Sequence, residues 1–269
     1  MSVATVNGVE LFYEEIGAGE PMLMMHGLGL DHQYLRPWHD PLADRARLIY
    51  YDQRWNGASG RVGEPDHAMW HADAAALLDH LAIARAMIYG HSYGAWLALG
   101  FAARYPDRVS RLIVSDGSPA FDYPDVVMAN AQRKDPAAAQ ILAAAFAALP
   151  TEDAALGTLW HQILPLYFKG APRPEILDGT RYSAHGFALG MAALGAFSMV
   201  DKLPKMTMPI LALVGGDDYI TPPEQSRRIA ALAPHAQVVE LHQSGHFPFV
   251  EEQAAYLAAI DAFIPTART

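Results

Sequence analysis

Short runs of apolar residues recur along the chain, and glycine, proline, serine or acidic residues bound each run. Apolar runs of about 4 to 8 residues between such boundaries are typical of strands buried in a sheet. An Asn7-Gly8 pair between two stretches rich in strand-forming residues predicts an N-terminal β-hairpin. The expected strands cover residues 2–6, 9–13, 21–25, 47–51, 86–89, 111–114, 209–214 and 237–241.

Segments with helical patterns separate most of these runs. An amphipathic, alanine-rich pattern covers residues 66–84, and an apolar helix is expected directly after residue 94. Two further helices are expected at about 223–233 and 248–264. Short apolar strands that alternate with helices predict an α/β fold with a mostly parallel central sheet and helices on both faces.

Residues 119–203 interrupt this alternation. The segment is rich in Ala, Leu, Met and aromatic residues, and its prolines divide it into several short helices. We therefore expect a core domain formed by residues 1–118 and 204–269, with residues 119–203 inserted as a helical lid over one edge of the sheet. Most large side chains of the lid are expected to form its core, and about a third of them to line a pocket beneath it; the candidates are Phe121, Tyr123, Trp160, His161, Tyr167, Phe168, Tyr182, Phe187, Met191, Phe197 and Met199.

The sequence Gly90-His91-Ser92-Tyr93-Gly94 lies between an expected strand and an expected helix. A G-x-S-x-G turn in that context forms a nucleophile elbow, in which the serine hydroxyl is exposed at the tip of a sharp turn. The two glycines remove Cβ atoms that would obstruct such a turn. Ser92 is therefore the candidate nucleophile, with backbone N–H groups close by to stabilise an oxyanion.

A serine hydroxyl needs a base, and that base needs a carboxylate to orient it. Residues 215–222 follow one expected strand and contain Asp217 and Asp218. Residues 242–252 follow the last expected strand and contain His246. Asp116, at the end of the strand over 111–114, is a third candidate for the acid. All of these side chains are expected at the carboxyl edge of the parallel sheet, where such folds build their sites.

The bulk properties exclude several classes of protein. The net charge of the 269 residues is −10, and no Lys/Arg cluster offers a surface for a phosphate backbone, so nucleic acid is not an expected partner. The N-terminus lacks the basic and apolar regions of a signal peptide, and no apolar run is long enough to span a bilayer. We expect a soluble, cytoplasmic protein without a cofactor, and the sequence leaves a homodimer open.

No metal site is expected either. The chain contains no cysteine, which excludes thiol catalysis, disulfides and thiolate metal sites. His67 and His71 are four residues apart on an expected helix, but the residues between them lack the glutamate of the H-E-x-x-H pattern. We interpret this pair as part of an ordinary helix face.

The motifs together resemble those of the α/β-hydrolase family, in particular its lid-bearing serine esterases and proline-iminopeptidase-like hydrolases. The resemblance covers nearly the whole chain outside the lid. The matching segments are His26-Gly27-Leu28-Gly29, Asp52-Gln53-Arg54 with Asn56-Gly57-Ala58-Ser59, the elbow, residues 215–222 and residues 244–251. The resemblance implies the α/β-hydrolase fold.

The resemblance also assigns roles. Ser92 becomes the nucleophile, His246 the general base and acid, and Asp218 the orienting carboxylate, because the acid is the fourth residue of the family's G-x-x-D-x-x-x-P pattern. The backbone N–H groups of Leu28 and Tyr93 form the oxyanion hole. His26 supports the loop that carries Leu28 by hydrogen bonding.

Two departures from the family pattern matter for function. Proline iminopeptidases carry a His-Gly-Gly-Pro-Gly loop where this chain has His26-Gly27-Leu28-Gly29-Leu30, and Trp55 replaces the first glycine of the D-x-R-G-x-G-x-S loop. The first departure argues against a peptidase. Trp55 is expected either near the pocket or at a packing surface.

We therefore expect a metal-free serine hydrolase that cleaves a small-molecule carboxylic ester or lactone through an acyl-enzyme. An aminopeptidase or amidase similar to the proline iminopeptidases is the alternative enzyme. A ligand receptor on a hydrolase scaffold is the alternative outside catalysis. Dehalogenase and epoxide hydrolase activities are disfavoured, because those relatives use Asp at the position of Ser92.

Overall fold

A computed structural model describes residues 2–264. Its centre is an eight-stranded sheet with the order β1-β2-β4-β3-β5-β6-β7-β8. The strands are β1 (Ser2–Val6), β2 (Val9–Ile16), β3 (Glu20–Met25), β4 (Ala46–Tyr51), β5 (Ala86–His91), β6 (Val109–Ser115), β7 (Ile210–Gly215) and β8 (Ala236–Leu241). Strands β4, β3, β5, β6, β7 and β8 run parallel, and only β1–β2 and β2–β4 pair antiparallel. The expected α/β class and mostly parallel sheet are confirmed.

Side chains alternate between the two faces of the sheet. On β3, Leu23 and Met25 pack with helices on one face, whereas Met22 and Met24 belong to the core of the other face. All four are at most 1 % exposed. Central parallel strands are covered on both sides, so they read as continuous apolar runs rather than as alternating patterns. For this reason the central strands were predictable from the sequence.

The helices divide between these two faces. Residues of α2 (His67–His80), α3 (Tyr93–Arg104) and α8 (Pro223–Leu232) pack in the core of one face. Residues around α1 (Arg36–His39), together with α9 (Pro248–Glu251) and α10 (Gln253–Phe263), belong to the core of the other. No helix in the described range 2–264 is long and apolar enough to cross a membrane.

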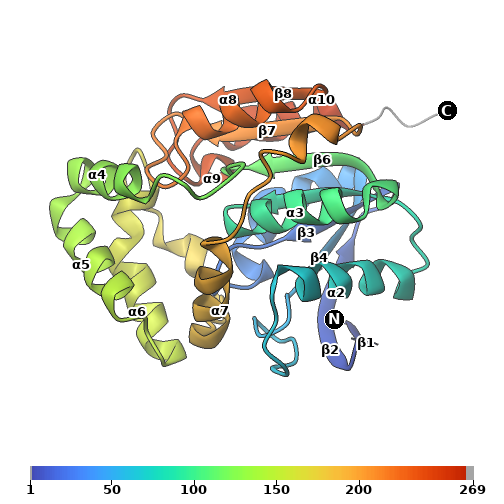
Figure 1. Cartoon of the computed structure of the whole chain (residues 1–269), viewed down its shortest axis with the longest axis horizontal. Helices are drawn as coiled ribbons and strands as arrows, with labels where there is room; N and C mark the ends of the chain where they lie inside the picture. The colour runs from blue at the N-terminus through green and yellow to red at the C-terminus, as the bar shows by residue number, and fades with distance from the viewer. Residues whose placement is uncertain (1, 265–269) are drawn as a thin grey trace.

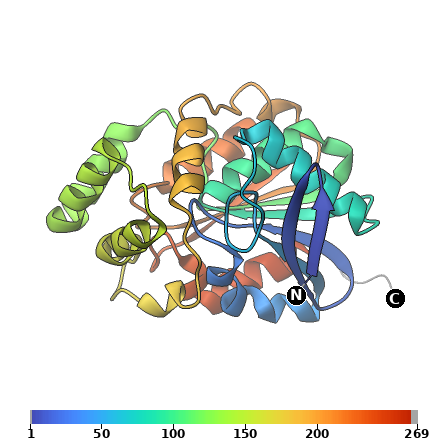
Figure 2. The same ribbon diagram turned by 90° about the horizontal axis from the view of Figure 1, so that it is seen from below.

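The chain between β6 and β7 is helical. It contains α4 (Pro124–Lys134), α5 (Pro136–Ala147), α6 (Asp153–Ile163) and α7 (Ala184–Leu194), with short 3₁₀ turns between and after them. Prolines begin α4 and α5, where the absent N–H costs no hydrogen bond. Figures 1 and 2 show α4, α5 and α6 at one end of the molecule, on the side opposite the β1–β2 hairpin. In the sheet order, too, the hairpin lies at one edge.

Some boundaries differ from the sequence-based expectation. The single helix expected over 248–264 is two helices, α9 and α10, which break at Glu252. The side chain of Glu252 accepts hydrogen bonds from the Gln243 N–H and the Ser244 hydroxyl, and its backbone leaves the helical region. The short turns over 32–44 were not predicted, because three to five residues are too few to show a helical period. Residues 1 and 265–269 of the expected core domain lie outside the described residues.

His39 provides a test of how the core responds to pH. Its ring is fully buried, Nδ1 lies 2.9 Å from the Leu35 carbonyl oxygen, and Nε2 lies 2.9 Å from the Tyr89 hydroxyl. Burial lowers the pKa of His39 to about 4. Below its ordinary pKa of 6.5 the unfolded chain therefore binds a proton that the folded chain does not, so stability falls as the pH drops from 6.5 towards 4.

Replacing His39 by Gln removes this titration and is expected to reduce the pH dependence of stability. Between pH 6 and pH 5 the loss of unfolding free energy is expected to be smaller than in the wild type by about 1 kcal/mol. Urea denaturation at pH 7, 6 and 5 measures it. His235→Gln, at an exposed histidine, is the matched control. An equal change of unfolding free energy with pH in the wild type and in His39→Gln would contradict the expectation.

Candidate active site

The site lies at the carboxyl edge of the parallel strands. Ser92 directly follows β5, Asp218 follows β7 and His246 follows β8, while the loop over 26–31 follows β3. Neighbouring parallel strands end at the same edge, so residues far apart in the sequence meet there. Ser92, His246 and the loop residues Gly27 and Leu28 line one cavity.

The turn at Ser92 has the backbone of a nucleophile elbow. Ser92 has φ 56° and ψ −124°, a strained conformation for a residue with a Cβ atom. A Cβ at Gly90 would lie 2.1 Å from the Gly94 carbonyl oxygen, and a Cβ at Gly94 would lie 2.1 Å from that of Met25. Both glycines of the motif are thus required by close backbone contacts. Tyr93 begins α3, so its N–H is among those without a partner inside the helix.

Asp218 and His246 are in direct contact. Oδ2 of Asp218 lies 2.7 Å from Nδ1 of His246, and because a carboxylate only accepts, Nδ1 carries the hydrogen. The Thr221 hydroxyl donates to the same Oδ2, and the N–H groups of Ile220 and Thr221 donate to Oδ1. Burial acts to raise the pKa of Asp218, but the His246 charge and these hydrogen bonds outweigh it and hold the pKa below its ordinary value.

When the imidazole is neutral, Nε2 of His246 is therefore its acceptor. It is buried and has no hydrogen-bond partner among the described residues. His246 and Ser92 border the same cavity, but no hydrogen bond joins Nε2 to the Ser92 hydroxyl. Such contacts are often long in the absence of substrate and tighten when it binds.

Among the described residues, neither of the two other acid candidates forms a hydrogen bond or ion pair with His246. Asp217 forms an ion pair with Lys134, whose Nζ lies 2.8 Å from its Oδ2. Asp116 is fully buried, accepts from the Gly215 N–H and the Ser115 hydroxyl, and lies close to Asp218. Burial and the Asp218 charge raise the pKa of Asp116 well above its ordinary value. Of the three candidates, only Asp218 bonds to His246.

The loop after β3 is held by His26. Its Nε2 accepts from the Gln53 N–H at 3.2 Å, so Nδ1 carries the hydrogen and donates to the Gly27 carbonyl oxygen at 2.9 Å. Burial lowers the pKa of His26 to about 4, which keeps the ring neutral. The peptide bond is trans, so the Leu28 N–H points away from the fixed Gly27 carbonyl. The supporting role expected for His26 fits these contacts.

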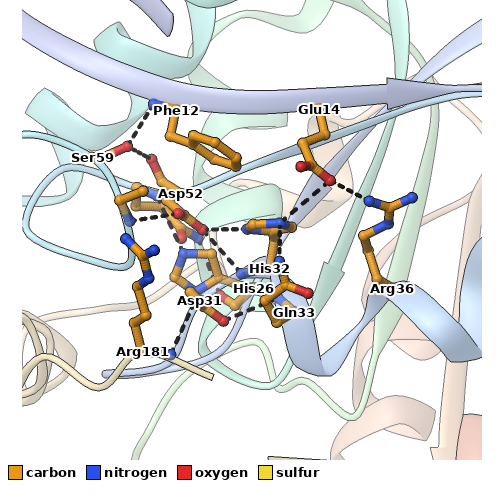
Figure 3. Close-up of polar contacts among 12 residues, drawn as sticks. Phe12, Glu14, His26, Asp31, His32, Gln33, Arg36, Asp52, Ser59 and Arg181 are labelled. Atoms are coloured by element: carbon orange, nitrogen blue, oxygen red, sulfur yellow. Dashed lines mark hydrogen bonds and ion pairs between the residues drawn. The ribbon is translucent and has the colours of Figure 1, made fainter. Parts of the chain in front are cut away.

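A buried polar network surrounds this loop (Figure 3). The Asp52 carboxylate lies 2.8 Å from Nδ1 of His32 and accepts from the Ala58 N–H. Asp31 accepts from the backbone N–H groups of Gln33 and Arg181, and the second of these contacts ties the loop to the helical segment (Figure 3). Burial and the Asp52 charge raise the pKa of Asp31 to about 6.

Two clusters of histidine and aspartate have metal-ligand chemistry. Asp31, His32 and Asp52 form one, and Asp116, Asp218 and His246 form the other; in each, the potential ligand atoms lie within 4.8 Å of one another. Hydrogen bonds within the protein already engage the members of both clusters. We interpret them as parts of the networks described above.

The helical segment over residues 119–203 supplies half of the residues that line the cavity. This segment contributes Phe121, Val127, Leu142, Phe146, Leu159, Trp160, Ile163, Tyr167, Phe187, Met191 and Leu194. Of the side chains expected there, Phe121, Trp160, Tyr167, Phe187 and Met191 line the cavity, whereas Tyr123, His161, Phe168, Tyr182, Phe197 and Met199 are not among its lining residues. Apart from His91 and His246, none of the described lining residues is acidic or basic.

Two other sequence features lie outside this cavity. The Trp55 ring packs on His185 at the start of α7, with 4.1 Å between ring centroids, so it is at a packing surface. Nε2 of His67 lies 3.0 Å from the Tyr93 hydroxyl. The contact of Thr221 with Asp218 was not predicted from the sequence, although an acceptor three residues before a threonine N–H is a recognisable Asx-type turn.

Comparisons with known proteins agree with this architecture. A family model described as "alpha/beta hydrolase fold" matches residues 20–253. The chain is 30 % identical over 268 residues to the pimeloyl-[acyl-carrier protein] methyl ester esterase of Chromobacterium violaceum, covering 96 % of this chain and 99 % of the relative.

Two solved structures with similar folds are also hydrolases. The enol-lactonase from Burkholderia xenovorans LB400 is 25 % identical with a TM-score of 0.74, covering 97 % of this chain and 99 % of that chain. A thermophilic esterase from Thermogutta terrifontis is 27 % identical with a TM-score of 0.72, covering 97 % of this chain and 95 % of that chain. These relatives agree with the expectation of an enzyme that hydrolyses ester bonds. The chain belongs to the alpha/beta hydrolase fold family.

Proposed function

We propose that the chain is a serine hydrolase that cleaves a carboxylic ester or a lactone through an acyl-enzyme. The observation that carries the proposal is the contact between Asp218 and His246 beside a serine held in an elbow. The relatives named as an esterase and an enol-lactonase support this class of substrate.

In the first half-reaction the Ser92 oxygen attacks the ester carbonyl carbon while Nε2 of His246 takes the hydroxyl proton. The Asp218 carboxylate stabilises the resulting imidazolium and holds Nδ1–H in place. Negative charge develops on the carbonyl oxygen, where the N–H groups of Leu28 and Tyr93 stabilise it. The imidazolium then gives its proton to the departing alkoxide, and the acyl group remains on Ser92.

In the second half-reaction water attacks the acyl-enzyme. His246 takes one proton from the water and returns it to the Ser92 oxygen as the acid leaves. A lactone follows the same path, except that the alcohol stays attached to the product. This chemistry needs only side chains and backbone groups that already lie around the cavity.

The substrate is proposed to be neutral and mostly apolar. Apart from the two histidines, no described lining residue is Asp, Glu, Lys or Arg, so a substrate carboxylate or ammonium would lose its hydration without gaining an oppositely charged partner. The absence of an acidic wall also disfavours the proline-iminopeptidase-like alternative, which must bind a free amino group. We propose that residues 119–203 act as the lid over this pocket.

A substrate panel tests this function. We expect kcat/KM for p-nitrophenyl esters of neutral acyl groups and for simple lactones to exceed that for proline arylamides at least about 100-fold, because burying an unpaired ammonium costs several kcal/mol. Initial rates at pH 7.5 measure the ratio. Faster cleavage of the arylamides would favour the aminopeptidase, and saturable binding without turnover would favour a ligand receptor.

A further inference from the structure

A line of hydrogen bonds runs beneath the candidate site through Tyr34 and His91. The Gly27 N–H donates to the Tyr34 hydroxyl oxygen at 2.7 Å. That oxygen lies 2.9 Å from Nδ1 of His91, and Nε2 of His91 lies 2.8 Å from the backbone carbonyl oxygen of His246. The line therefore joins the loop after β3, the elbow after β5 and the loop after β8.

Chemistry fixes the direction of every bond in this line. The His246 carbonyl oxygen can only accept, so Nε2 of His91 carries a hydrogen. Burial and the neighbouring His246 charge lower the pKa of His91 far below its ordinary value, so the ring is neutral and Nδ1 is an acceptor. The Tyr34 hydroxyl must then donate to Nδ1 and accept from Gly27 with its oxygen. No alternative arrangement satisfies all of these atoms.

The bridging side chains are well fixed. Tyr34 and His91 are each 1 % exposed. Their rings pack on one another and on Phe249, with centroid distances of 4.9 to 6.3 Å. Water cannot easily replace a hydrogen bond lost here, so an unpaired group would be strongly unfavourable.

We propose that Tyr34 and His91 are positioning residues that set the oxyanion donor at Leu28 and the base His246 at fixed places relative to Ser92. This inference rests on the proposed function. It extends that function to two residues that need not contact the reacting atoms, one of which is the first variable residue of the G-x-S-x-G motif.

The hydrogen bonds of Tyr34 and His91 hold both the loop that carries the Leu28 N–H and the loop that carries His246. The Gly27 carbonyl is held by His26 and the Gly27 N–H by Tyr34, so the peptide that carries the Leu28 N–H is anchored on both sides. A Cβ at Gly27 would lie 3.7 Å from Cβ of Ser92, which shows how close this peptide is to the nucleophile. On the other side, the His246 carbonyl is held by His91. Loss of these hydrogen bonds would free the Gly27 N–H and the His246 carbonyl from their partners.

The first test compares Tyr34→Phe with Tyr89→Phe. Each variant removes one buried hydroxyl, but that of Tyr89 bonds to Tyr256 and His39, away from the oxyanion loop. We expect Tyr34→Phe to lower kcat on a p-nitrophenyl ester about 10- to 100-fold, since misplacement by about 1 Å can cost that much. KM should stay within about 3-fold, and binding of a trifluoromethyl ketone inhibitor should weaken by the same factor as kcat. Equal kcat for the two folded variants would overturn the inference.

The second test uses His91 and remains decisive if Tyr34→Phe does not fold. His91→Gln keeps one donor and one acceptor, whereas His91→Leu keeps neither. We expect the Gln variant to retain at least about 10-fold more kcat than the Leu variant. A folded His91→Leu with wild-type kcat would overturn the inference.

Ser92→Ala separates this inference from the proposed function. Turnover retained by Ser92→Ala would refute the proposed function and the inference with it. An inactive Ser92→Ala together with a Tyr34→Phe variant that matches Tyr89→Phe would refute the inference alone.

Discussion

Replacing Ser92 or His246 by alanine is expected to lower kcat on an ester by about 10⁴- to 10⁶-fold, and the double replacement is expected to lose little more. The reason is that each side chain works only through the other. The serine oxygen is a weak nucleophile until Nε2 of His246 takes its proton, and the imidazole has no other proton to take in the acylation step. The residual rate comes from binding and from the oxyanion donors.

Steady-state kinetics on a p-nitrophenyl ester, together with labelling by a fluorophosphonate, measures this effect. Labelling should disappear in Ser92→Ala. His246→Ala leaves the buried Asp218 carboxylate without its imidazole partner, so thermal melting must show that the variant is folded. His246→Gln is the matched variant, because its amide can still donate to Asp218. Losses that multiply in the double variant would show that the two residues do not act as a unit.

Local pattern was sufficient to place the elements that carry the site. The run Ala86-Met87-Ile88-Tyr89 is fully buried within β5, and the glycines of the following G-x-S-x-G stand where a Cβ atom would clash with the backbone. Apolar continuity and glycine spacing are both properties of neighbouring residues. This is why the strand and the elbow were predictable without any knowledge of distant contacts.

Features that depend on tertiary contacts were not predictable in this way. Tyr34 and His91 are 57 positions apart, and nothing in either segment indicates that their side chains meet. The lid illustrates the same limit. Helical patterns and prolines indicate short helices, but whether Phe187 on α7 or Tyr182 just before it faces the cavity depends on how this part of the chain packs against the core.

The identity of the acid was only partly predictable from the sequence. Asp217 and Asp218 are adjacent in one turn, so only the family register distinguished them in the sequence. In the structure, one carboxyl group faces Lys134 and the other faces His246. Asp116 follows the neighbouring strand β6, and its burial beside Asp218 raises its pKa. The distinction is therefore electrostatic as well as geometric, and mutagenesis can test it.

Asp218→Asn is expected to lower kcat by about 10⁴-fold. The amide can turn its N–H₂ group towards Nδ1 of His246, which then becomes an acceptor, and the hydrogen moves to Nε2. A ring in that tautomer cannot take the Ser92 proton. By contrast, Asp116→Asn keeps the shape of a side chain whose hydrogen bonds go to Ser115 and Gly215 and not to His246, and Asp217→Asn removes only a surface ion pair, so each should keep kcat within about 10-fold of the wild type. Kinetics of the three variants at pH 7.5 decides the assignment. A large loss in Asp116→Asn with little change in Asp218→Asn would make Asp116 the functional acid.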